Sequence, residues 1–95
     1  MTSTESNPDG RTYQVVGDRV AWRQTDDEAV VLDLEDSVYY GLNPTGVLLW
    51  KRLAAGATRR DLVGMLVASG APAERASADV DAFLTELGSY GLLTS

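Results

Sequence analysis

The carboxylates of Asp33, Glu35 and Asp36 are the closest grouping of side chains that could act as general acids or hold a cation. They follow a strand-like segment, and no glycine-spaced ligand loop accompanies them, so we interpret them as a solvated turn. The chain contains no histidine and no cysteine. This excludes Ser-His-Asp triads, Cys-His pairs and thiolate zinc sites. We therefore expect no catalytic residue, no metal ion and no cofactor.

The main chain itself is the stronger candidate for a functional group, in the segment Val38, Tyr39, Tyr40 and Gly41. β-Branched and aromatic residues favour a strand. If this strand is the last of a meander, its outer edge carries unpaired N–H and C=O groups, and no charge or proline within it blocks pairing. Glycine in a strand often marks the close approach of another backbone. The pattern predicts that an extended peptide adds here as a further strand.

Side chains of such a peptide would need a second wall, and the last amphipathic segment of the chain could supply it. Asp79 would lie at the rim, where it could meet a basic residue or a backbone N–H. Taken singly, the aliphatic residues of this segment suit the core better than a ligand contact, and we also expect Trp22, Trp50, Leu53 and Met65 in the core. The candidate wall consists of Ala76, Asp79, Val80, Phe83, Leu84 and Leu87.

Hydrophobic periodicity predicts three strands followed by three helices. In the second strand, Val30, Leu32 and Leu34 alternate with Val31 and Asp33, as in a strand buried on one side. The predicted strands span residues 20–24, 29–34 and 38–42, and the helices residues 44–55, about 58–69 and 73–89. Residues 13–16 form either a lead-in strand or an ordered arm.

Local signals mark the helix ends. Asn43 and Pro44 are a preferred N-cap and first helical residue. Thr58 and Asp61 have the spacing of a capping box. These elements predict an α+β domain, a three-stranded antiparallel sheet followed by three helices that cover one face of the sheet. We expect residues 1–12 to form a disordered tail and residues 13–95 to form the one domain.

Charge is distributed unevenly along the chain. Residues 1–50 carry nine acidic and three basic side chains, whereas residues 51–95 carry five of each, so the strand half holds the whole net charge of -6. This charge opposes nucleic acid and favours a neutral or basic partner. No membrane-length apolar run or signal peptide is present, so we expect a cytoplasmic protein without a membrane partner. A candidate docking cluster for a protein partner comprises Lys51, Arg52, Arg59 and Arg60.

Taken in order, several of these segments resemble PqqD-like domains, the recognition elements of pathways that make ribosomally synthesised and post-translationally modified peptides. The tyrosine-rich strand resembles the stand-alone members of lasso-peptide gene clusters. Ser37 departs from the pattern, because relatives often have glycine there. The matching segments are Val31 to Leu34, Tyr39 to Gly46, Leu49-Trp50, Leu53, Gly56 to Thr58, Asp79 to Leu87 and Gly91 to Leu93.

The resemblance implies a winged helix-turn-helix-like fold and a non-catalytic function. A precursor's leader peptide would bind as an added antiparallel strand between the third strand and the third helix, with the ring of a Tyr-x-x-Pro motif in the apolar cleft. A separate cysteine-type leader protease and an ATP-dependent macrocyclase would then process the precursor.

Two other functions remain open. A winged-helix nucleic-acid-binding protein would suit the fold class, but Asp79, Asp81 and Glu86 stand where a recognition helix needs basic residues. A structural subunit of a larger enzyme would bury Tyr39 and Tyr40 against its partner. The free sheet edge is compatible with a monomer or a weak dimer. An enzyme in its own right is the least supported class.

Overall fold

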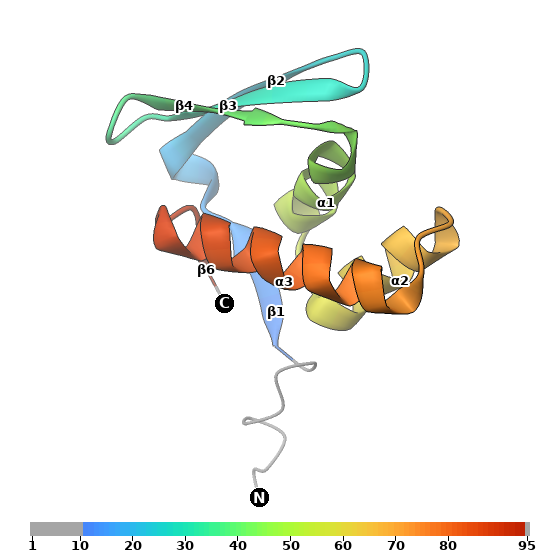
Figure 1. Cartoon of the computed structure of the whole chain (residues 1–95). Helices are drawn as coiled ribbons and strands as arrows, with labels where there is room; N and C mark the ends of the chain where they lie inside the picture. The colour runs from blue at the N-terminus through green and yellow to red at the C-terminus, as the bar shows by residue number, and fades with distance from the viewer. Residues whose placement is uncertain (1–10, 95) are drawn as a thin grey trace, which may run out of the picture.

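The computed structural model describes residues 11–94 and contains two small sheets and three α-helices (Figure 1). Its elements, in chain order, are β1 (Thr12–Val15), a 3-10 turn η3 (Gly17–Arg19), β2 (Val20–Thr25), β3 (Glu28–Asp33), β4 (Val38–Leu42), α1 (Pro44–Ala55), β5 (Ala57–Thr58), α2 (Arg59–Ala68), α3 (Ala73–Ser89) and β6 (Leu93–Thr94). The expected α+β class, with an antiparallel meander followed by three helices, is confirmed.

The meander has the order β2-β3-β4, and its helix-facing side is set by the register. Ala29 pairs with Leu42, Val31 with Tyr40 and Asp33 with Val38, so these residues share one face. Val31 and Asp33 are buried, whereas Val30 and Leu34 on the opposite face are about half exposed. The alternation in β3 therefore marks a strand buried on one side, and that side is the one with fewer large apolar residues.

Trp22 corrects one sequence-based expectation, because it is 39% exposed and not part of the buried core. It lies on the rim of the inner face, opposite Val31. Its ring packs edge-on against Trp50, with the ring centroids 6.2 Å apart and an interplanar angle of 76°. β2 is an edge strand, and its outer position leaves part of this large ring in solvent.

The helices fold beneath the inner face of the meander, with α1 between the sheet and α3 (Figure 1). Asn43 caps α1 as predicted, since its Oδ1 accepts a hydrogen bond of 2.8 Å from Gly46 N. Thr58 and Asp61 form the predicted capping box at the start of α2. The core is shared by all three helices and includes Leu49, Trp50, Leu53, Leu62, Leu66, Val80, Leu84, Leu87 and Leu92.

A second small sheet, β5-β1-β6, joins both ends of the described chain to the helices. Thr12 and Tyr13 pair with β5, and Gln14 and Val15 pair with β6. The open question about residues 13–16 is thereby answered, because residues 12–15 form a strand. The strand begins at Thr12, which had been assigned to the tail. The rest of that tail, apart from Arg11, lies outside the described residues. None of the helices in the described part of the chain is long and apolar enough to cross a membrane.

Candidate functional site

β4 is the strand at the helix-side edge of the meander and has a described partner strand on one side only. Tyr39 is 69% exposed and Val38 is 41% exposed. Gly41 is exposed, and a methyl group added to its backbone would meet nothing within 4 Å. No charged side chain or proline stands within this strand to prevent another strand from pairing. The predicted segment of four residues is therefore an accessible edge.

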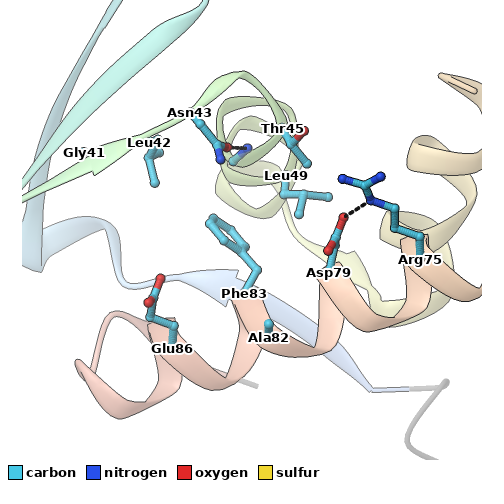
Figure 2. Close-up of a pocket in the computed structure, with 11 residues that line it drawn as sticks. Gly41, Leu42, Asn43, Thr45, Leu49, Arg75, Asp79, Ala82, Phe83 and Glu86 are labelled. Carbon is cyan, nitrogen blue, oxygen red and sulfur yellow. Dashed lines mark hydrogen bonds and ion pairs between the residues drawn. The ribbon is translucent and has the colours of Figure 1, made fainter. Parts of the chain in front are cut away.

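A pocket of about 390 Å³ opens beside the Leu42 end of this edge (Figure 2). Three elements meet there: the last residues of β4, the first turn of α1 and one face of α3. The lining of the pocket combines apolar and charged side chains and exposes more polar than apolar surface, which suits an amphipathic side chain carried on an extended chain. Its lining residues are Gly41, Leu42, Asn43, Thr45, Gly46, Leu49, Arg75, Asp79, Ala82, Phe83 and Glu86.

Phe83 connects the two walls of the pocket. Its ring reaches from α3 toward the start of α1 (Figure 2), where a methyl group at Gly46 would lie 3.5 Å from the Phe83 ring and 3.3 Å from Asn43 Oδ1. The tight contact would be with the N-cap oxygen of Asn43, whereas the Phe83 ring would lie at an ordinary van der Waals distance. Asp79 lies on the rim, 4.0 Å from the guanidinium of Arg75 in the adjacent helical turn. This exposed ion pair is loose enough for Asp79 to accept another partner.

The wall residues predicted on α3 lie on two different faces of the helix, one in the core and one at the pocket. Ala76, Val80, Leu84 and Leu87 are buried in the core. They support the wall from behind, and only Asp79 and Phe83 of the six predicted helix residues line the pocket. Sequence reasoning missed Ala82, Glu86 and Arg75. The i, i+3, i+4, i+7 spacing of Asp79, Ala82, Phe83 and Glu86 would have identified a second continuous face of the same helix.

Aromatic packing joins the middle of β4 to the end of α3. Tyr40 stacks on Tyr90, the residue that ends α3, with ring centroids 4.2 Å apart and an interplanar angle of 21°. Burial is the main reason that the pKa of the Tyr40 phenol lies above its ordinary value. The predicted strand residue Tyr40 therefore ties β4 to the end of α3, whereas Tyr39 points away from the helices.

The turn between β3 and β4 is organised by Asp33, which is fully buried and not solvated as the sequence suggested. Its Oδ1 accepts hydrogen bonds from the backbone N–H groups of Glu35 and Asp36. Arg19 donates to both carboxylate oxygens, and this bonding is the main reason that the pKa of Asp33 lies below its ordinary value. Ser37 has φ 57°, the left-handed conformation that favours glycine. Glu35 and Asp36 are exposed as expected, and no metal-binding group occurs in the described part of the chain.

The basic candidate cluster is divided by intramolecular contacts. Arg52 donates to Gly56 O at 2.6 Å and lies 3.5 Å from the carboxylate of Asp61. It therefore connects the end of α1 to the start of α2. Arg59 forms a bidentate salt bridge with Asp81 on α3. Lys51 and Arg60 are exposed. A shallow groove of about 470 Å³ brings together Arg59, Arg60, Val63, Gly64, Val67 and Ala68.

Fold and site together define a small α+β domain in which an open sheet edge faces a helix across a pocket. Residues 28–93, more than half of the chain, match the model of the family described as coenzyme PQQ synthesis protein D (PqqD). The chain belongs to the PqqD family, as the sequence resemblance indicated. None of the curated proteins matches the sequence closely enough to count as a relative.

Two solved structures share the fold over nearly their whole length. One, described as TbiB1 in complex with the TbiA(beta) leader peptide, has a TM-score of 0.78 and 28% identity, over 86% of this chain and 95% of that one. The other, a lasso peptide synthetase B1 complexed with the leader peptide, has a TM-score of 0.75 and 26% identity, over 87% of this chain and 98% of that one. Both similar proteins are therefore described as holding a leader peptide.

Proposed function

We propose that this protein binds the leader of a ribosomally made lasso-peptide precursor as an added antiparallel strand along β4, with α3 as the facing wall. The observation that carries the proposal is the accessible edge of β4 beside the pocket at Phe83, in a fold shared with two proteins described as leader complexes. Strand addition takes affinity from main-chain hydrogen bonds and specificity from alternate side chains.

The pocket supplies the specificity in this proposal. Its volume of about 390 Å³ accommodates an aromatic ring against Leu42, Leu49 and Phe83. A tyrosine in a Tyr-x-x-Pro motif would place its ring there and its hydroxyl near the rim at Asp79. Main-chain pairing together with burial of one ring and a few aliphatic groups corresponds to micromolar to nanomolar affinity, about -8 to -12 kcal/mol.

The protein acts without catalysis in this scheme. Its side chains include neither histidine nor cysteine, and the leader is removed by a separate protease of the cysteine type before an ATP-dependent macrocyclase closes the core peptide. These steps belong to the cytoplasm, where the precursor is made. We assign protease docking to the groove on α2 at Arg59, Arg60 and Val67, with Lys51 and Arg52 at the neighbouring helix end.

Fluorescence polarisation tests the proposal directly. The protein is titrated into a labelled synthetic leader peptide that carries a Tyr-x-x-Pro motif, and into the same peptide with its tyrosine replaced by alanine. We expect saturable 1:1 binding of the native leader and at least tenfold weaker binding of the alanine leader, a difference of about 1.4 kcal/mol. Absence of binding to the native leader would refute leader recognition, and equal binding of both leaders would refute the assignment of the pocket to the ring.

A further inference from the structure

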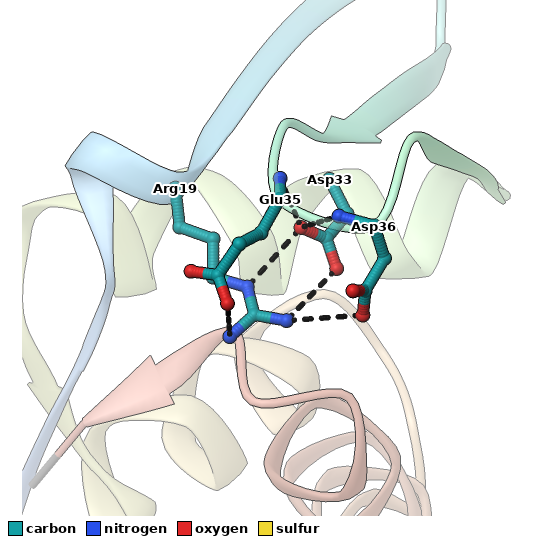
Figure 3. A network of polar contacts seen from close by, with 4 residues as sticks. All are labelled: Arg19, Asp33, Glu35 and Asp36. Carbon is teal, nitrogen blue, oxygen red and sulfur yellow. Dashed lines mark hydrogen bonds and ion pairs between the residues drawn. The ribbon is translucent and has the colours of Figure 1, made fainter.

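Arg19 lies outside the pocket, yet its guanidinium holds the hairpin that carries β4 (Figure 3). Nε is 3.1 Å from Asp33 Oδ1, and Nη2 is 3.2 Å from Asp33 Oδ2 and 3.3 Å from Asp36 Oδ2. Nη1 lies 3.6 Å from a carboxylate oxygen of Glu35. Because Asp33 is fully buried while Arg19 is only 20% exposed, the bidentate contact is shielded from water and from salt.

The same guanidinium lies close to the turn that follows α3, where Gly91 leaves space for it. A methyl group added at Gly91 would lie 3.0 Å from Arg19 Nη1 and 3.4 Å from its Cζ. Gly91 has φ 77° and directly follows Tyr90, the C-cap of α3. Arg19 is therefore bonded to the β3–β4 hairpin and lies close to the turn after α3, and these two elements border the site.

A second connection lies between the same two elements. Tyr40 and Tyr90 stack at 4.2 Å, and Tyr40 is only two residues from Val38, which pairs with Asp33. The Arg19 contact is at the Val38 end of β4 and the Tyr40–Tyr90 stack is at its central residue, whereas the pocket opens at the Leu42 end. The two walls are thus joined from the Val38 end as far as Tyr40 and open at the Leu42 end.

The separation of the walls matters because an added strand must lie about 4.8 Å from β4 and still place its side chains against α3. A hairpin that moved relative to α3 would have to be ordered on binding, which lowers affinity. We propose that Arg19 is a positioning residue for leader binding: by holding the β3–β4 hairpin against the turn after α3, it sets the width of the cleft before the peptide arrives. The inference rests on the proposed function, since it concerns how the same edge is made ready.

Arg19→Lys tests this inference, because lysine keeps the charge but cannot reproduce the bidentate fork. The control is Asp81→Asn, which breaks another two-pronged arginine–aspartate contact, Arg59 to Asp81, that joins α2 to α3 away from the cleft. Labelled leader is titrated at a temperature at which thermal melts show every variant to be folded. We expect Arg19→Lys to bind about tenfold more weakly and Asp81→Asn to bind within about twofold of the native protein.

Hydrogen exchange of the free protein gives a readout that needs no ligand. Arg19→Lys should accelerate amide exchange in residues 38–42, and Asp81→Asn should leave that segment unchanged. Native leader affinity together with native exchange in Arg19→Lys would overturn the inference while leaving the proposed function intact. Equal loss of affinity in both variants would show a general effect of stability and also overturn it. If the native protein itself bound no leader, the proposed function would fail first, and the inference with it.

Discussion

At the scale of single residues, the site depends on side chains that occupy the boundary between core and solvent. Phe83 is half-buried, with its ring between α3 and the first turn of α1, and Asp79 is exposed one helical turn earlier. Their buried neighbours Val80 and Leu84 belong to the core, so replacing those would damage the fold before it tested binding. A rim residue is the better probe, because its change affects a ligand and little else.

Asp79→Ala should weaken leader binding without lowering the melting temperature. The carboxylate contributes one exposed contact at the pocket rim, which corresponds to a loss of up to about fivefold in affinity. Glu74→Ala removes the same charge from the exposed first turn of α3, outside the pocket lining, and serves as the matched control. Fluorescence polarisation and thermal melts measure both effects. Normal binding by Asp79→Ala would remove Asp79 from the site.

At the scale of elements, the sequence predicted what local chemistry determines. The bounds of β4 and α1 followed from the β-branched and aromatic run and from Asn43 with Pro44, and the capping box of Thr58 and Asp61 marked the start of α2. The two-residue strands β5 and β6 carry no periodicity, so only their pairing with β1 reveals them. The inner face of β3 was ambiguous because Asp33 lies on it, and its partner Arg19 is 14 residues away.

The same limit applied to the site. The edge strand could be recognised from its residue types, since nothing in it prevents pairing. The face of α3 that lines the pocket could not be recognised from the sequence. The hydrophobic pattern of an amphipathic helix identifies its buried face but does not define the borders of that face. Ala82 and Glu86 lie on such a border, and the chain reversal that brings them opposite Leu42 and Asn43 is a property of the folded molecule.

The β3–β4 hairpin should be sensitive to acid through Asp33. Hydrogen bonds from Arg19 hold the folded-state pKa of this carboxyl below its ordinary value of 3.8. A carboxyl whose pKa is lower in the folded state stabilises the protein fully above the unfolded value, and this stabilisation is lost as the pH falls through the folded value.

Asp33→Asn isolates this contribution, because the amide oxygen can still accept from the N–H groups of Glu35 and Asp36 while the charge is removed. The melting temperature of the native protein should exceed that of the variant by a constant amount above about pH 5 and approach it at lower pH. Comparison with Asp33→Asn separates this effect from Asp61 and Asp81, whose pKa values are also lowered by hydrogen bonds. A difference that grew on acidification would contradict the assignment.

At the scale of the whole molecule, charge and edge geometry select the partner. The net charge of -6 opposes a phosphate backbone, and α3 carries Asp79, Asp81 and Glu86. A neutral or basic extended peptide meets no such opposition. The edge of β4 is equally open to a second copy of the chain, since an antiparallel pair of identical strands satisfies two-fold symmetry. Leader and second copy would then compete for the same main-chain groups.

The edge of β4 offers only five residues for pairing, so we expect a dimer formed through it to bury less than the roughly 1,200 Å² of stable interfaces. Such a dimer should be weak, and leader binding should dissolve it. Sedimentation velocity over a concentration series measures this. We expect self-association only at high concentration, a monomeric 1:1 complex once leader is added, and loss of self-association in Val38→Lys, which places a charge on the edge. A dimer that persisted with leader bound, or that Val38→Lys left unchanged, would place the contact elsewhere on the molecule and leave the edge of β4 to the peptide alone.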